Sequence, residues 1–173
     1  MLELARIYRE GREDITVDMF EAYKWAHEAA RRDSPEGYME ITRILGSVCI
    51  AANEYGLQQD CVRKLVTVCD PDTLFRLGLP DIAFNVGSIT EYMARLVHDG
   101  PHYLKDMLSY YETAVKYFSL AASLQIVSGN EGPAPASIPA AQEGIGRVVE
   151  ELRGLSRSTS RRPLIKPSGI DLL

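Results

Sequence analysis

The sequence lacks the regular alternation of apolar and polar residues that marks β-strands, and it contains no Asn-Gly hairpin turn. No apolar run approaches the length of about 18 residues that a membrane-spanning helix needs. The first residues, MLELARIYRE, have neither the basic start nor the uninterrupted apolar stretch of a secretory signal. These absences predict an all-α, cytoplasmic protein without a membrane span.

Basic residues and cysteines are also few. The 173 residues include 19 lysines and arginines against 24 aspartates and glutamates, a net charge of −5. A chain of this charge lacks the basic surface that broad binding to nucleic acid requires. Cys49, Cys61 and Cys69 are an odd number of cysteines, without the CxxC spacing of a zinc site. We therefore predict no nucleic-acid partner, no metal and no disulfide framework, with the thiols buried.

Apolar residues spaced three or four apart predict helices over most of the first 127 residues. The expected helices cover 1–10, 19–32, 36–55, 58–69, 72–77, 81–98 and 105–126. Asp18, Ser34-Pro35 and Asp70-Pro71 are typical start signals, and Gly11 and Gly56 are typical stops. This pattern predicts one helical domain over 1–127.

The composition changes after residue 127. Residues 128–139, SGNEGPAPASIP, predict a flexible linker. Residues 140–155 recover an apolar stripe and predict a short amphipathic helix, and 156–173 predict a disordered basic tail. We interpret the helix at 140–155 as a cap on the open end of the helical domain, and a tethered partner-binding segment is the alternative.

An internal repeat is the most informative feature. The spacing of Leu4-Ala5-x-x-Tyr8-x-x-Gly11 recurs at Leu45-Gly46-x-x-Cys49-x-x-Ala52 and at Met93-Ala94-x-x-Val97-x-x-Gly100. The spacing of Ala22-x-x-Trp25-x-x-x-Ala29-Ala30 recurs at Ala114-x-x-Tyr117-x-x-x-Ala121-Ala122. Small residues let two helices approach closely and the aromatic residue fills the remaining gap. Each unit therefore predicts a pair of antiparallel helices.

These residues resemble the Sel1-like repeat family, a relative of the tetratricopeptide repeats. The resemblance is close over 1–33 and weaker over 91–123, where Val97 and Tyr110 replace the family's tyrosine and aspartate. It implies an α-solenoid of antiparallel helix pairs (an alpha-alpha superhelix) that acts as a scaffold or adaptor without a cofactor. A generic helical bundle is the alternative. The motif positions are Leu4, Tyr8, Gly11, Asp18, Ala22, Trp25, Ala29, Ala30, Leu45, Gly46, Ala94, Gly100, Ala114, Tyr117, Ala121 and Ala122.

We therefore predict a non-enzymatic module that binds a protein or peptide in a groove lined by the first helix of each pair. Tyr8 and Trp25 are expected in the core. Arginine and aromatic side chains are frequent interface anchors. The candidate contacts, on outward positions of the first helices, are Arg6, Arg9, Tyr38, Arg43, Tyr92 and Arg95.

Two other functions stay open. His98 and His102, with Asp106 nearby, suggest a small hydrolase, although Gly100-Pro101 breaks the helix between the two histidines. A self-associating structural subunit is the other alternative, because the first helix leaves Leu4 and Ile7 poorly covered.

Overall fold

The computed structural model describes residues 1–12, 14–96, 103–129 and 132–159, with the side chains of 156–159 left out. In this part of the chain the backbone forms eight helices and no strand, so the all-α prediction is confirmed there. His98, Gly100 and His102 lie outside the described residues. The helices are α1 (Leu2–Glu10), α2 (Met19–Ala30), α3 (Pro35–Ala51), α4 (Tyr55–Val68), α5 (Pro71–Leu77), α6 (Pro80–Leu96), α7 (Tyr103–Ser128) and α8 (Ala134–Thr159).

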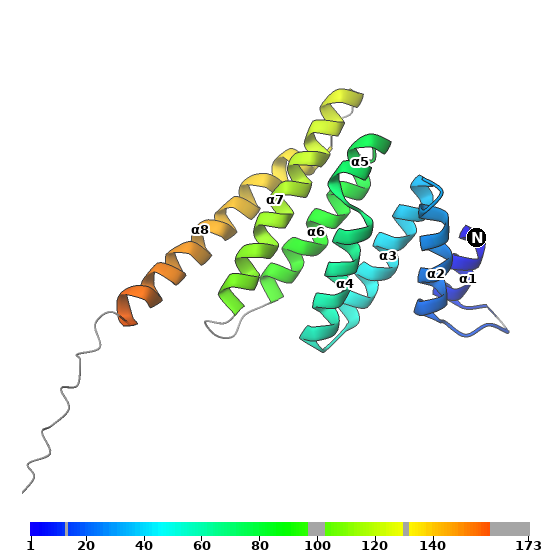
Figure 1. The fold of residues 1–173 in the computed structure, drawn as a ribbon, viewed down its shortest axis with the longest axis horizontal. Helices are drawn as coiled ribbons and strands as arrows, with labels where there is room; N and C mark the ends of the chain where they lie inside the picture. Colours follow the sequence, from blue (N-terminus) through cyan, green and yellow to red (C-terminus); the bar gives the residue numbers. More distant parts are fainter. Residues whose placement is uncertain (13, 97–102, 130–131, 160–173) are drawn as a thin grey trace, which may run out of the picture.

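The helices lie side by side in an elongated row that follows the order of the chain (Figure 1). α1 packs on α2, α2 on α3, α3 on α4, α6 on α7, and α7 on α8. Direct contacts also join α1 to α3 and α3 to α6. The helices α1, α3 and α6, each the first of a predicted pair, therefore form a contiguous series, and we call them the first helices.

Side-chain caps fix the starts of α2, α3 and α5. Asp18 Oδ1 accepts hydrogen bonds of 3.0 Å from the backbone N–H groups of Phe20 and Glu21, which fixes the start of α2. Asp70 Oδ1 accepts a bond of 3.0 Å from the Thr73 N–H at the start of α5 in the same way. The predicted stop at Gly56 is wrong, because α3 ends at Ala51 and Gly56 lies in the first turn of α4.

Helix α8 differs most from the expectation. It begins at Ala134, inside the segment expected as a linker, and it runs to Thr159, past the expected end at 155. Pro135 lies in the first turn, where a missing backbone N–H costs nothing. Ala134 and Ala141 are buried on the side of α8 that faces α7. Packing of small residues against α7 thus extends the helix into a segment whose composition favours a loop.

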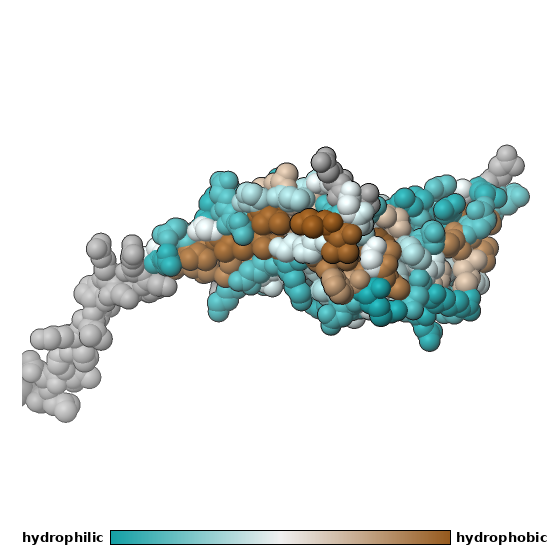
Figure 2. Space-filling view, turned by 90° about the horizontal axis from the view of Figure 1, so that it is seen from above, coloured by the Kyte–Doolittle hydropathy of each residue, from teal (hydrophilic) through white to brown (hydrophobic). Residues whose placement is uncertain are grey.

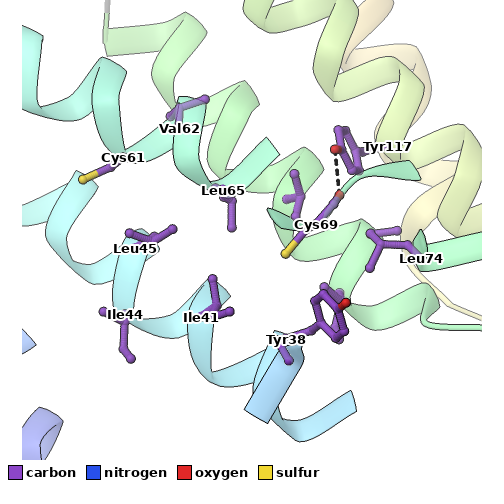
Figure 3. Packing of buried hydrophobic residues seen from close by; sticks show 14 of the residues in the cluster. Tyr38, Ile41, Ile44, Leu45, Cys61, Val62, Leu65, Cys69, Leu74 and Tyr117 are labelled. Carbon is purple, nitrogen blue, oxygen red and sulfur yellow. Dashed lines mark hydrogen bonds between the residues drawn. The ribbon is translucent and has the colours of Figure 1, made fainter. Parts of the chain in front are cut away.

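The largest core cluster includes residues of all eight described helices, and Figure 3 shows the part of it around Tyr38, Ile41, Leu65, Leu74 and Tyr117. All three cysteines are buried, as predicted, and they are free thiols. The alanines of the second repeat halves are buried in both α2 and α7. Of the aromatic motif residues, Tyr117 is fully buried, whereas Tyr8 and Trp25 are half-buried at the edge of this cluster.

Glycine permits a close approach where α2 turns into α3. A Cβ atom at Gly37, in the first turn of α3, would lie 2.5 Å from the backbone nitrogen of Ala30. No side chain fits at that distance, so the turn from α2 into α3 requires glycine. Among the described residues, no helix is both long and apolar enough to cross a bilayer.

Candidate functional site

A groove between α3 and α6 is the candidate site. Its main part is a cavity of about 430 Å³ lined by Met39, Thr42, Arg43, Gly46, Ser47, Ile50, Asn85, Ser88 and Ile89. A second cavity of about 280 Å³ shares Met39 and lies where the N-terminal ends of the two helices meet, with Glu36 and Asp81 in its lining. We call the two cavities together the α3–α6 groove. It runs along two neighbouring first helices, where the repeat pattern predicts a binding groove.

The repeat glycine of the middle unit controls how closely the two helices approach. A Cβ atom at Gly46 would lie 3.0 Å from the Ile89 Cδ1 atom. The absence of a side chain at Gly46 lets Ile89 of α6 rest against the α3 backbone. This contact closes the floor of the groove, so a residue that belongs to the structural motif also shapes the site.

The polar side chains of the groove differ in their hydrogen-bond partners. The hydroxyls of Thr42 and Ser88 donate to carbonyl oxygens of their own helices, at 2.8 and 3.0 Å. The Asn85 amide nitrogen lies 3.5 Å from the Met39 sulfur, a weak acceptor. A peptide carbonyl would be a stronger acceptor for this amide, which makes Asn85 the group best placed to bind main chain.

Two arginines enclose a buried carboxylate beside the groove. Glu40 of α3 is 2% exposed. Its Oε1 accepts from Arg9 Nε of α1, and its Oε2 accepts from Arg43 Nη1 at 3.3 Å. The hydrogen bond to Glu40 raises the pKa of Arg9 above its ordinary value. This Arg9–Glu40–Arg43 triad ties α1 to α3 and leaves the Arg43 side chain 53% exposed at the groove.

The six candidate contact residues lie in different surroundings in the structure. Arg43 lines the α3–α6 groove, and Arg95 lines a neighbouring cavity. Arg6 is exposed on α1, and Tyr92 is half-buried on α6. Arg9 is engaged with Glu40 and Glu10, so its main contacts are structural.

Tyr38 requires a correction. It was expected on an outward position, but it is 6% exposed and belongs to the core cluster. Its spacing from Ile41 and Leu45 places all three on one side of α3, so the inward position was readable from helical periodicity. The groove residues Met39, Asn85 and Ile89 were not identified from the sequence, because they belong to helices whose pairing the repeat pattern does not specify residue by residue.

A larger cavity of about 630 Å³ lies between the end of α6, the start of α7 and the middle of α8. Arg95, Arg147, Glu143 and Glu151 all line it, so its charges are mixed, and Arg147 pairs with Glu143 at 3.7 Å. Because α8 itself forms one wall, this cavity is a crevice at the junction of α7 and α8 rather than a continuation of the α3–α6 groove.

Apolar side chains are also exposed at the N-terminal end of the helix row and near the end of α7. The first are Leu4, Val17 and Phe20, and the second are Ile126 and Val127. Figure 2 shows an elongated apolar band over the half of the molecule that α7 and α8 form. Exposed apolar residues such as those of α1 and α2 are expected where a stack of helices stops.

The described residues contain no cluster of three histidine, cysteine or carboxylate side chains that would hold a metal ion. Asp106 accepts hydrogen bonds from the Tyr55 hydroxyl at 2.9 Å and from Gln59 at 3.3 Å, which ties α7 to α4. Burial is the main cause that raises the pKa of Tyr55. The carboxylate suggested for a hydrolase therefore has structural partners.

Comparison with models of protein families, with curated proteins and with solved structures finds no match to this chain. The function is therefore inferred from the groove and the residues around it.

Proposed function

We propose that the chain is a Sel1-like, tetratricopeptide-like α-solenoid whose α3–α6 groove binds a segment of a protein partner. The contact series of α1, α3 and α6 supports the solenoid, because these helices carry the three copies of the first repeat half. The second position of each copy, at Ala5, Gly46 and Ala94, is buried. The equivalent residues thus occupy equivalent environments, as stacked units require.

The single observation that carries the binding function is the cavity on the first helices. Measured along α3 from Glu36 to Ile50, the groove is about 21 Å long, since fourteen residues rise about 1.5 Å each. An extended peptide of about six residues spans this length. The described residues that line the main cavity include no histidine, carboxylate or cysteine, the usual groups of acid–base or nucleophilic catalysis, which favours binding over a reaction.

Affinity capture from the native source tests the groove directly. Ser88→Trp fills the main cavity. Ser123→Trp is the matched control, because Ser123 on α7 makes the same hydrogen bond to the carbonyl four residues earlier and lies outside the groove. We expect the wild type and Ser123→Trp to capture the same protein and Ser88→Trp to lose it, with unchanged helical circular dichroism. Equal capture by all three proteins would reject the groove as the binding site.

Self-association is the second candidate function, and the exposed Leu4, Val17 and Phe20 favour it. They place three apolar side chains at the N-terminal end of the helix row. If this surface pairs two copies, the wild type is a dimer by multi-angle light scattering and Phe20→Lys is a monomer. A monomeric wild type at high micromolar concentration excludes it.

A further inference from the structure

We infer that the chain forms a two-fold symmetric dimer through one side of the α7–α8 pair, so that the helices of two copies build a four-helix bundle. This surface lies at the opposite end of the helix row from Leu4, Val17 and Phe20 (Figure 1). It includes none of the residues that line the α3–α6 groove. The dimer is therefore a property beyond the proposed binding function.

Each helix of the α7–α8 pair carries an apolar stripe whose members alternate in steps of three and four residues, the spacing of a coiled coil. The members are, on α7, Leu104, Leu108, Tyr111, Val115 and Phe118, and, on α8, Ile138, Ala141, Ile145, Val148 and Leu152. All of them belong to, or pack against, one core cluster that also includes Ala94 of α6. The two helices therefore pack on each other along these stripes.

One side of the two stripes is partly open to solvent. Every second member is buried, and the members between them are half-buried, namely Leu108, Val115, Ile138, Ile145 and Leu152. We call these five half-buried residues the outer face. Ile145 lies two residues from both Glu143 and Arg147, about 200° around α8, and those two residues line the crevice beside α6. The outer face is thus on the side of α8 away from that crevice.

The α8 positions beside the outer face carry little charge. Those next to Ile145 on this side are uncharged, namely Gln142, Gly146 and Val149. Glu143, Arg147 and Glu151 lie on the crevice side instead. An apolar band is visible over the half of the molecule that α7 and α8 form (Figure 2). Depletion of charge around a large apolar surface is typical of the centre of a protein interface.

Two charged residues of α7 favour a second copy as the partner. Glu112 and Lys116 are exposed beside Val115, and no ion pair joins either of them to another described residue. A two-fold axis at the level of residue 114 sets the α7 helices of two copies antiparallel and brings Glu112 of each copy opposite Lys116 of the other. Residue 114 is close to the middle of α7, so the two helices overlap over most of their length. A second copy therefore supplies both complementary charges through symmetry alone.

The size of the surface also fits a dimer. α7 and α8 have 26 residues each. Each helix is thus about 39 Å long, and the packed pair is about 20 Å wide. This gives a surface of roughly 800 Å² per copy, the area that a stable interface typically buries on each side. Pairing two such surfaces places the half-buried stripe residues of both copies in the centre of a four-helix bundle.

Sedimentation velocity of the full chain across the micromolar range tests the inference, and we expect a dimer whose population rises with concentration. Glu112→Lys and Lys116→Glu are each expected to raise the dissociation constant about tenfold, because each places like charges across the axis. The double variant Glu112→Lys/Lys116→Glu is expected to return the dissociation constant to that of the wild type. A monomeric wild type would overturn the dimer, and a double variant weaker than both single variants would overturn the two-fold arrangement.

A matched pair of isoleucine variants locates the interface. Ile126 follows Glu112 by fourteen residues, so it lies on the same side of α7, and it is 77% exposed. Ile126→Glu is expected to raise the dissociation constant of the dimer. Ile50→Glu is the control, because Ile50 is an exposed isoleucine near the end of α3 and is expected to have no effect. A dimer that Phe20→Lys dissociates and Ile126→Glu leaves intact would place the pairing at the N-terminal end and overturn the inference.

Discussion

The Tyr117 hydroxyl donates a hydrogen bond of 2.8 Å to the carbonyl oxygen of Cys69, the residue that ends α4 (Figure 3). Carbonyl groups at the end of a helix have no partner within the helix. Tyr117, from the middle of α7, supplies that partner although it lies 48 residues after Cys69 in the chain. The aromatic residue of the repeat motif thus packs between helices and also caps the end of a helix from a different part of the chain.

Tyr117→Phe is expected to destabilise the protein by about 1–2 kcal/mol, because it keeps the ring and removes the partner of a buried carbonyl. Urea unfolding followed by circular dichroism measures the loss as a lower midpoint with an unchanged slope. Tyr103→Phe, at an exposed position in the first turn of α7, is the control and is expected to change stability little. Equal effects of the two variants would contradict the capping role of Tyr117.

Replacing either of two glycines of α8 by alanine is expected to change the stability of the protein, and the two changes are expected to have opposite signs. A Cβ atom at Gly144 would lie 2.5 Å from Cζ of the buried Tyr111 ring, whereas Gly146 has nothing within 4 Å. We expect Gly144→Ala to destabilise the protein by about 1–3 kcal/mol through overpacking. Gly146→Ala is expected to stabilise it by about 0.5–1 kcal/mol through higher helix propensity. Urea midpoints measure both effects, and effects of the same sign would contradict the packing of α8 on α7.

Much of the fold was predictable because local signals agree with tertiary packing in α1 to α7. Asp18 and Asp70 cap helices that their positions in the sequence predict. The start of α8 was missed because proline and glycine in 128–139 favour a loop when each residue is considered alone. Burial of Ala134 and Ala141 against α7 overrides that preference, and such a contact is invisible without knowing which helix lies alongside.

The candidate site was predictable in part. The helical pattern of the sequence identified Arg43 and Arg95 as outward positions of the first helices, and both line cavities. It did not reveal that Glu40 is buried, since a glutamate on a helix is normally solvated. The burial of Glu40 depends on its contact with Arg9 of α1, and these two residues are 31 positions apart in the chain.

Stability is expected to fall as pH rises above about 9. Burial raises the pKa of Cys49 to about 11 and of Cys69 to about 12, from an ordinary value of 9.0. Above pH 9 an unfolded thiol has lost its proton and a folded one keeps it, so the unfolded state binds fewer protons and unfolding becomes easier. The stabilisation from the protonated thiols is fully present below pH 9. It is lost progressively as the pH rises from 9 to the pKa values of the folded protein.

Urea unfolding between pH 7.5 and 10.5 measures this dependence, which reaches about 1.4 kcal/mol per pH unit for each thiol. Cys69→Ala is expected to reduce the slope of stability against pH, whatever its effect on stability at pH 7.5. Burial raises the pKa of Tyr117 in the same direction, so part of the decline persists above pH 10 in this variant. An unchanged slope in Cys69→Ala would show that its thiol does not contribute.

Arg9→Gln is expected to lower the free energy of unfolding by about 1–3 kcal/mol. The substitution leaves the buried Glu40 carboxylate with Arg43 alone, and removing one partner of a buried ion pair costs more than the pair contributes. The cost stays below that of a fully buried pair because Arg9 is partly exposed. Arg12→Gln is the control and is expected to have little effect, since Arg12 pairs with Glu3 and both side chains are exposed.

The triad also predicts where the Arg9→Gln protein opens. Since Glu40 joins α1 to α3, hydrogen exchange is expected to accelerate in α1 more than in α7, which packs mainly on α6 and α8. Adding Glu40→Leu to Arg9→Gln removes the unbalanced carboxylate and is expected to restore part of the lost stability. If the double variant is less stable than Arg9→Gln alone, the cost comes from lost packing of the arginine side chain and not from the buried charge.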